Sequence, residues 1–348
     1  MAPYQSVTPG NGLALWHGIA YDCAHSSRPF RAIAVIELNN LRKEYDDLAA
    51  VEDLTLSIPQ GEIYGLIGPN GAGKTTTIRM SCGLLVPTQG GVRVAGVDVI
   101  RRPEQALTLI GYLADFFSVY EDLKVWEYLD YFAHAHKMSE AQIPARITEV
   151  IAEVGLEVKR DALIRGLSRG MKQRLGIARA IIHRPRVLLL DEPASGLDPK
   201  ARFDLRNLLR SLRDQGATIL ISSHILTELE GFCTSIGIME RGRLLRSGTI
   251  AEVTAAGNPA RVLRLRWLGD STAMIETLVG RNEKASRLTF AQQGREANEG
   301  SFHFSGSEDE LAQLLAGLIG AGVRVLAFTE VRQTVEDLYM KLSRHEVM

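Results

Sequence analysis

The 348 residues are 45% hydrophobic and 23% charged, a composition typical of a soluble globular protein with roughly two to three domains. Lys and Arg number 40 against 41 Asp and Glu, a net charge of −1, so overall charge does not indicate a nucleic-acid partner. Three scattered cysteines indicate neither a disulfide framework nor a metal site, and no apolar run approaches the roughly 20 residues that span a bilayer.

The chain opens with a predicted flexible extension, residues 1–32, which lacks a basic residue before Arg28 and so does not resemble a secretory signal. Next, Leu54, Leu56 and Ile58 alternate with polar residues, as in a half-buried strand. Apolar Ile63–Ile67 then predicts a strand that leads into a glycine loop, and a helix is expected over Thr75–Gly83.

This glycine loop, Gly68–Thr75, fits the phosphate-binding pattern G-x-x-x-x-G-K-[ST] in its required strand–loop–helix context. Backbone N–H groups of such a loop close on phosphate oxygens, Lys74 supplies a positive charge to the β- and γ-phosphates, and the Thr75 hydroxyl binds Mg²⁺. The predicted contacts with ATP are Gly68, Pro69, Asn70, Gly71, Ala72, Gly73, Lys74, Thr75 and Thr76.

Residues from about Phe116 to Gly166 read as mostly helical, with apolar faces at Val125, Leu129 and Phe132 and again from Ile143 to Val154. Leu167–Gln173 follows, and a helix is predicted over Met171–Ile182. The Ser168 hydroxyl and free N–H groups before that helix form an outward-facing anion site, which a second subunit must complete. Taken alone, this segment would be an ordinary helix cap.

Two adjacent carboxylates, Asp191 and Glu192, end the fully apolar strand Val187–Leu190. Ligands collect at the carboxyl ends of strands in open α/β sheets. Asp191 is therefore a candidate Mg²⁺ ligand and Glu192 a candidate general base for water. A second buried strand is expected at Thr218–Ile221, and turn-rich Gly242–Gly248 is expected to end this core.

A basic run around these motifs has two interpretations: a solvated helix face, or a field that attracts nucleotide phosphates. Its members are Arg165, Arg169, Lys172, Arg174, Arg179, Arg184 and Arg186. His134 and His136 are expected to face different ways on their helix and not to share a metal. Trp126, Tyr128 and Tyr131 are interpreted as core or as a docking face.

The tail from about Ala260 predicts the order β-α-β-β-α-β of a ferredoxin-like unit. Its expected elements are a strand at Leu263–Trp267, helices at 271–279 and 308–319, and strands at 287–292, 302–305 and 323–328. Ser307 and Glu310 form a candidate capping box for the second helix. A final helix is predicted over Val335–Leu342.

These motifs together resemble the ATP-binding subunit of ABC transporters, in the branch that serves drug-, polysaccharide- and antibiotic-exporting permeases. The resemblance rests on the phosphate-binding loop, the signature motif Leu167–Gln173, the Asp191–Glu192 pair and the turn Ser195–Asp198. It is strong over residues 35–250, weak over 260–345 and absent over 1–30. It implies that Lys74, Glu192 and His224, the switch histidine that senses the γ-phosphate, are catalytic. It also implies that Tyr45 stacks on adenine and that Ser168, Gly170 and Asp198 contact nucleotide.

Two positions depart from the family pattern. Arg169 stands where the signature usually has a glycine, while Gly170 keeps the close backbone approach. Asp115 stands where the family has a glutamine that contacts Mg²⁺ or water and reports nucleotide state to the permease. Asp115 either ligates the metal, which the preference of hard cations for carboxylate oxygen favours, or only shapes its loop.

The resemblance implies an α/β P-loop ABC-type ATP-binding domain over residues 33–255, with a helical subdomain at about 116–175, and a small α+β domain over 260–345. ATP and Mg²⁺ are the expected cofactors. The expected partners are an identical or paired ATP-binding subunit and an integral-membrane permease, which holds the protein at the cytoplasmic face of the cell membrane; no nucleic acid is expected. The alternatives are a non-transport ABC ATPase that acts on ribosomes or DNA, and a P-loop kinase or other NTPase.

Overall fold

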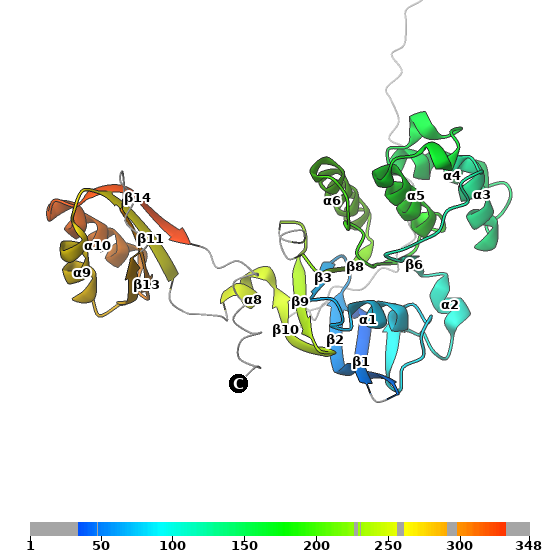
Figure 1. Cartoon of the computed structure of the whole chain (residues 1–348). Coiled ribbons are helices and arrows are strands. Elements are labelled where there is room, and N and C mark those ends of the chain that lie inside the picture. The colour runs from blue at the N-terminus through cyan, green and yellow to red at the C-terminus, as the bar shows by residue number, and fades with distance from the viewer. Residues whose placement is uncertain are drawn as a thin grey trace, which may run out of the picture. The chain divides into compact units, whose positions relative to one another are not determined.

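The computed structural model describes residues 34–46, 48–225, 229, 231–255, 261–290 and 298–331. The predicted N-terminal extension and the predicted helix at Val335–Leu342 lie outside these ranges. Figure 1 shows two sheets and their helices in the first part of the described chain, and a separate antiparallel sheet with two helices in the tail.

The first sheet is antiparallel, in the order β2-β1-β4-β5. Its strands are β1 (Ala34–Tyr45), β2 (Leu48–Pro59), β4 (Gln89–Val94) and β5 (Val97–Asp98). The alternation predicted within β2 is confirmed, because Leu54, Leu56 and Ile58 are buried while Thr55 and Ser57 are exposed. The buried side of this sheet packs on the second sheet in a shared apolar core.

The second sheet has the strand order β10-β9-β3-β8-β7-β6, in which only the β10–β9 pair is antiparallel. Its strands are β3 (Ile63–Ile67), β6 (Ile110–Leu113), β7 (Val187–Leu190), β8 (Thr218–Ser223), β9 (Ser235–Glu240) and β10 (Arg243–Thr249). All residues of β3, β7 and β8 are buried, as expected for parallel strands covered on both faces. Ile67 pairs with Ser223 and Leu190 with Ile221, so the carboxyl ends of these three strands lie together.

The helices of this part include the two with predicted apolar faces, at Val125–Phe132 and Ile143–Val154, and these faces are buried except for the partly buried Phe132. The helices are α1 (Lys74–Ser81), α2 (Pro103–Leu107), α3 (Val125–Ala135), α4 (Ile143–Glu153), α5 (Arg169–Ile181), α6 (Pro199–Asp214) and α8 (Ile250–Ala255), with short 3₁₀ turns at Glu157–Lys159 and Ile164–Gly166. Residues 116–124 are not helical. The helix predicted from Met171 begins two residues earlier, because Ser168 caps it by accepting a hydrogen bond from the Met171 N–H.

The prediction that Gly242–Gly248 is a turn-rich end of the core is wrong. All of them except Gly242 belong to β10, which pairs with β9 in register Arg243↔Glu240 to Thr249↔Ser235. The turn is confined to Arg241 and Gly242, whose φ angles of 47° and 82° suit a two-residue hairpin. The sequence pattern of β10 is weak because the strand lies at the edge of the sheet and most of its residues are only partly buried.

The tail confirms the predicted order β-α-β-β-α-β. Its elements are β11 (Arg261–Leu268), α9 (Thr272–Gly280), β12 (Ala285–Phe290), β13 (Asn298–Phe304), α10 (Glu308–Gly320) and β14 (Arg324–Val331). The strands pair antiparallel in the order β12-β13-β11-β14 around a core that includes Trp267 and Phe302. Among the described residues, no helix combines the length and apolarity that a membrane crossing requires.

Candidate functional site

The phosphate-binding loop connects β3 to α1, as predicted. Gly73 has a φ of 98°, and a Cβ at this position would lie 2.5 Å from the Ala50 carbonyl oxygen, so the loop conformation requires glycine here. Helix α1 begins at Lys74, directly after this glycine. Its free N-terminal N–H groups and the helix dipole favour an anion at the loop.

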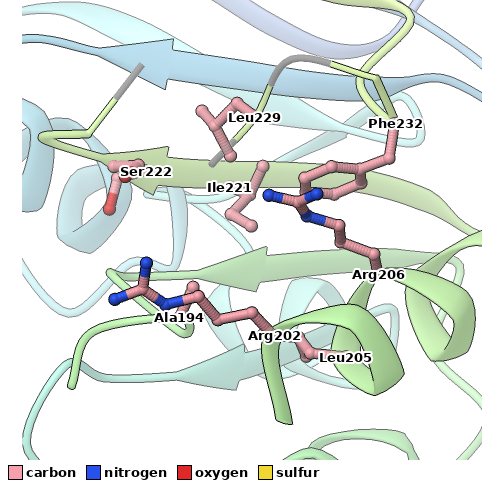
Figure 2. Close-up of a pocket in the computed structure, with 9 residues that line it drawn as sticks. Ala194, Arg202, Leu205, Arg206, Ile221, Ser222, Leu229 and Phe232 are labelled. Atoms are coloured by element: carbon pink, nitrogen blue, oxygen red, sulfur yellow. The ribbon is translucent and has the colours of Figure 1, made fainter. Parts of the chain in front are cut away.

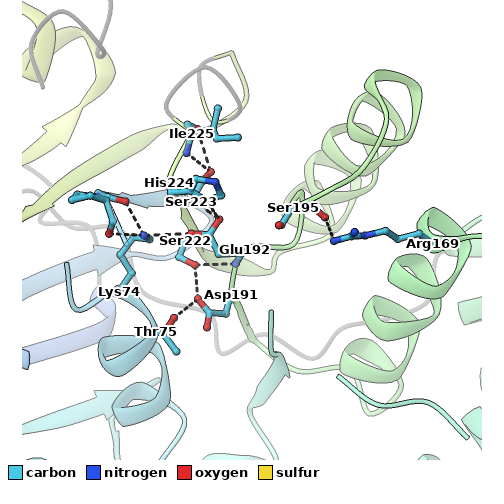
Figure 3. A network of polar contacts seen from close by, with 12 residues as sticks. Lys74, Thr75, Arg169, Asp191, Glu192, Ser195, Ser222, Ser223, His224 and Ile225 are labelled. Carbon is cyan, nitrogen blue, oxygen red and sulfur yellow. Dashed lines mark hydrogen bonds and ion pairs between the residues drawn. The ribbon is translucent and has the colours of Figure 1, made fainter. Parts of the chain in front are cut away.

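Lys74 is buried within the site, with an exposed fraction of only 5%. Its ammonium donates hydrogen bonds to the carbonyl oxygens of Gly68 (2.7 Å) and Pro69 (3.1 Å) and lies 3.4 Å from Glu192 Oε1 (Figure 3). The lysine of the loop and the second carboxylate of the Asp191–Glu192 pair, far apart in sequence, therefore meet in one site.

Asp191 lies at the buried end of β7, next to the loop. Its Oδ1 accepts hydrogen bonds from the Thr75 hydroxyl (3.1 Å) and the Ser222 hydroxyl (2.6 Å). Ser222 Oγ in turn accepts from the Glu192 N–H at 2.9 Å. Ser222 thus joins the ends of β7 and β8, a role that sequence reasoning missed although this hydroxyl follows directly on a predicted buried strand.

Glu192 lies between a lysine and a histidine. Its Oε2 is 2.8 Å from His224 Nδ1 and also accepts from the His224 backbone N–H at 3.3 Å, while Oε1 faces Lys74. The residue adopts a φ of 47°, an uncommon conformation for a non-glycine residue, of the kind often found at functional sites. The two adjacent carboxylates therefore have separate surroundings: Asp191 contacts two hydroxyls, and Glu192 contacts an ammonium and an imidazole.

Comparison with known proteins agrees with this geometry. Residues 51–195 match the family model described as ABC transporter. The chain is 35% identical to the Nod factor export ATP-binding protein I of Cupriavidus metallidurans, over 90% of this chain and 99% of that protein. The chain belongs to the ABC transporter family. It is the subunit that binds ATP and hydrolyses it for transport.

Solved structures support the same assignment. An ATP-binding subunit of an ABC transporter is 33% identical, with a TM-score of 0.58 over 64% of this chain and 92% of that one. A dimeric ATP-binding cassette in a post-hydrolysis state, bound to ADP and Pi, is 25% identical, with a TM-score of 0.56 over 62% of this chain and 98% of that one.

Asp115 follows β6 and lies close enough to the cassette's carboxylate pair to be affected by it. Burial, and then repulsion from Asp191 and Glu192, raises the pKa of Asp115, which His224 and Arg169 partly oppose. A cation placed among these three carboxylates would relieve the repulsion. Asp115 therefore belongs to the same electrostatic environment as the loop and the Asp191–Glu192 pair.

Other residues that were predicted to contact nucleotide lie outside the contacts around Lys74, Asp191 and Glu192. Ser168 and Asp198 are exposed and cap α5 and α6, the latter through a 2.9 Å bond from the Ala201 N–H. Tyr45, at the end of β1, is 46% exposed, with the Lys43 ammonium 5.2 Å from its ring centre. Among the described residues, no hydrogen bond or ion pair joins Ser168, Asp198 or Tyr45 to Lys74, Asp191 or Glu192.

The basic run of the cassette is largely a solvated, paired helix face. Four of its members form ion pairs: Arg165 with Asp122, Lys172 with Glu121, Arg174 with Asp204 and Arg184 with Glu149. Arg179 lies over the rings of Phe117 and Phe132. Arg169 instead donates to the Ser195 carbonyl oxygen at 2.9 Å. Because most of these charges are already paired, attraction of phosphates by the whole run is not favoured.

A cavity of about 10 Å³ lies behind the ends of β7 and β8, between Ser222 and helix α6 (Figure 2). Arg206 of α6 lies over the Phe232 ring at 5.9 Å, and Arg210 donates to the Gly231 carbonyl oxygen. The space is no larger than a single water molecule needs. It is a packing gap beneath the segment that carries His224 and not a second ligand site.

The histidines of the helical part face different ways, as predicted. His134 bonds to the Asp130 carbonyl oxygen, whereas the His136 ring stacks on His183 at 3.7 Å. Burial, followed by the nearby His136, lowers the pKa of His183 to about 4. Within the described parts of the chain, no group of three or more His, Cys, Asp or Glu residues is arranged to hold a metal ion.

Proposed function

We propose that Lys74, Glu192 and His224 carry out hydrolysis of ATP bound on the phosphate-binding loop. The observation that carries this proposal is the position of Glu192 between the Lys74 ammonium and the His224 ring. In this proposal, Glu192 accepts a proton from the attacking water, His224 orients the carboxylate and senses the γ-phosphate, and Lys74 holds the β- and γ-phosphates. Backbone N–H groups of Gly68–Gly73, with Thr75 and Thr76, hold the remaining phosphate oxygens, and Tyr45 stacks on adenine.

The residues around Asp191 suit Mg²⁺. The Thr75 hydroxyl and the buried Asp191 carboxylate are already 3.1 Å apart, and Asp115 adds a third oxygen donor group nearby. Mg²⁺ in nucleotide sites typically takes one or two carboxylates together with substrate phosphates. When bound, the ion would neutralise charge on the phosphates, and Thr75, Asp191 and Asp115 would hold it.

A second cassette is proposed to complete the site from the outside. Ser168, Gly170 and Asp198 lie at or beside the N-termini of α5 and α6, where helix ends favour anions, and Ser168 and Asp198 are exposed. In a head-to-tail pair of identical or related subunits, these residues face the nucleotide on the partner's loop. The dimeric cassette bound to ADP and Pi, to which this chain is similar, supports such a pairing.

The proposed membrane partner is an export permease, since a relative that this chain matches along nearly its whole length bears the name Nod factor export ATP-binding protein I. The permease would hold the protein at the cytoplasmic face of the cell membrane. Its docking face is proposed at Phe116, Tyr120 and Tyr131, whose exposed fractions are 88%, 56% and 54%. Tyr128, in contrast, is fully buried and belongs to the core.

We propose a division of the chain into an extension (1–32), an ATP-binding domain (33–255, with helical subdomain at about 116–175) and a ferredoxin-like accessory domain (260–345). The antiparallel order β12-β13-β11-β14, with an α-helix after the first and third strands, supports the last assignment.

The proposed function is tested by two substitutions with different expected effects. Lys74→Ala removes a phosphate contact and should weaken ATP binding. Glu192→Gln should leave binding intact but reduce hydrolysis by about 10²-fold or more, because only water activation is lost. The measurements are ATP affinity by equilibrium binding and phosphate release under single-turnover conditions. Wild-type phosphate release by Glu192→Gln would contradict the role of Glu192.

A further inference from the structure

Arg169, the first residue of α5, contacts the turn that follows the Asp191–Glu192 pair. Its guanidinium donates a hydrogen bond to the Ser195 carbonyl oxygen at 2.9 Å (Figure 3). It also covers Gly196, because a Cβ built on that glycine would lie 2.3 to 2.5 Å from the guanidinium carbon and two of its nitrogens. The contact requires both the planar arginine head and the missing side chain at Gly196.

The same turn is linked by hydrogen bonds to the proposed general base. The Ser195 N–H donates to the Glu192 carbonyl oxygen at 3.0 Å, and the Leu197 N–H donates to the Ala194 carbonyl oxygen at 3.2 Å. A path of two hydrogen bonds therefore leads from the Arg169 guanidinium, through the backbone of Ser195, to the backbone carbonyl of Glu192.

The N-termini of α5 and α6 meet beside this contact. A Cβ built on Gly170 would lie 3.3 Å from the Ala201 Cβ, so the two helices approach closely where each is capped, by Ser168 and Asp198. Among the described residues Arg169 forms no ion pair, unlike its neighbours Arg165 and Lys172. Its charge is directed at a carbonyl oxygen of the turn instead.

We propose that Arg169 is a positioning residue that holds the Ser195–Asp198 turn against the signature helix of the same chain and thereby aligns Glu192 for hydrolysis. The proposal rests on the assignment of Glu192 as the base. If the Arg169 guanidinium instead contacted a phosphate of the nucleotide, its loss would raise KM for ATP. Loss of a positioning contact would lower kcat.

Gly196→Ala offers a way to displace the guanidinium without altering Arg169. The new methyl group occupies the space of the arginine head, which must swing away from Ser195. Gly196 has a φ of 66°, so alanine also adds backbone strain. Gly96→Ala is the matched control, because Gly96 has a φ of 79° and nothing lies within 4 Å of its Cβ position.

The experiment compares steady-state ATP hydrolysis by the full chain as wild type, Arg169→Ala, Gly196→Ala, the double variant and Gly96→Ala. Each single change at the contact should lower kcat about 3- to 10-fold, the loss of one hydrogen bond, while KM for ATP stays within about twofold. The double variant should be no slower than the worse single variant, since both changes break one contact. Gly96→Ala should keep the wild-type kcat.

Three results would overturn the proposal: a raised KM with kcat preserved in Arg169→Ala, multiplicative losses in the double variant, or a Gly196→Ala protein that matches Gly96→Ala. Arg169 is exposed, so its kcat and KM remain decisive even if Gly196→Ala proves unstable in a thermal melt. Glu192→Gln is measured in parallel. If this variant still hydrolysed ATP, the assignment of Glu192 as the base would be refuted, whereas the Arg169 variants test only the positioning role.

Discussion

Asp115 shows how the role of one carboxyl depends on its surroundings. Its pKa is raised by burial and then by Asp191 and Glu192, against the opposing effects of His224 and Arg169. Sequence left two roles open, a metal ligand or a loop residue, and the Mg²⁺ dependence of hydrolysis distinguishes them.

Asp115→Asn should weaken the Mg²⁺ dependence of hydrolysis, because an amide oxygen is a poorer ligand for a hard cation than a carboxylate. We expect the Mg²⁺ concentration at half-maximal rate to rise by about 3- to 10-fold, corresponding to the loss of about 1 kcal/mol of ion binding. The measurement is a Mg²⁺ titration of ATPase rate in wild type and variant. Superimposable curves would rule out a metal contact.

His183 is the second residue whose surroundings have a measurable consequence. Its Nε2 lies 3.0 Å from the Ile110 carbonyl oxygen, its ring stacks on His136, and its buried Nδ1 has no hydrogen-bond partner in the described structure. Burial, His136 and Arg146 all disfavour a second proton, and Arg179 has the same effect on the stacked His136.

Stability should therefore fall on acidification through this residue. The unfolded chain binds the proton near pH 6.5, but the folded pKa is about 4. The stabilisation is complete above about pH 6.5 and is lost progressively as pH falls toward 4, by on the order of 3 kcal/mol. Unfolding of His183→Gln, measured by denaturant titration from pH 7 to 4, should lack this component. The control is His134→Gln, since the pKa of exposed His134 is raised instead; equal pH dependence in wild type and His183→Gln would contradict the assignment.

At the scale of single elements, the capping box of α10 is a local signal that the structure reproduces. Ser307 Oγ accepts from the Glu310 N–H at 3.3 Å, and Glu310 Oε2 accepts from the Ser307 N–H at 2.8 Å. The neighbouring helix α9 also has a serine at its N-cap, Ser271, but that side chain makes no capping hydrogen bond. Ser307 and Ser271 therefore occupy the same helix position, but only Ser307 makes a capping hydrogen bond.

Ser307→Ala should destabilise the tail by about 1 kcal/mol, the usual value of an N-cap hydrogen bond. Ser271→Ala should change stability by less than about 0.5 kcal/mol, because no cap bond is lost. Both are measured by chemical denaturation of the full chain in which Trp16 and Trp126 are replaced by Phe, so that fluorescence reports Trp267, which is buried in the tail core. Equal losses in the two variants would mean that the cap contributes nothing specific.

At the scale of the whole molecule, the proposed site belongs to two chains. Lys74→Ala and Ser168→Arg damage opposite sides of it, so neither homodimer retains an intact site. In a mixed dimer both lesions fall in one site and the other is whole.

Equal amounts of the two inactive proteins, mixed and allowed to exchange subunits, should recover about a quarter of wild-type ATPase, since half the dimers are mixed and each has one intact site. The measurement is ATPase rate against mixing ratio, with each variant alone as the control. No recovery after proven subunit exchange would place the whole site in one chain.

The sequence by itself determined the elements whose pattern lies within one continuous stretch of residues. Strand β3 with its glycine loop, the carboxylates after β7 and the βαββαβ order of the tail each follow from local periodicity or a short motif, and the structure reproduces them. The roles of the residues predicted to contact ATP and Mg²⁺ stay predictions.

Only the tertiary structure decided contacts that depend on strand order and helix packing. Strand β10 was missed because its stability comes from pairing with β9, not from its own weak pattern. Ser222 reaches Asp191 because β8 lies beside β7, and the Arg169 head fits over Gly196 because the ends of α5 and α6 converge. The Ser222–Asp191 and Arg169–Ser195 contacts join residues roughly 30 positions apart, a separation at which no local pattern in one sequence carries information.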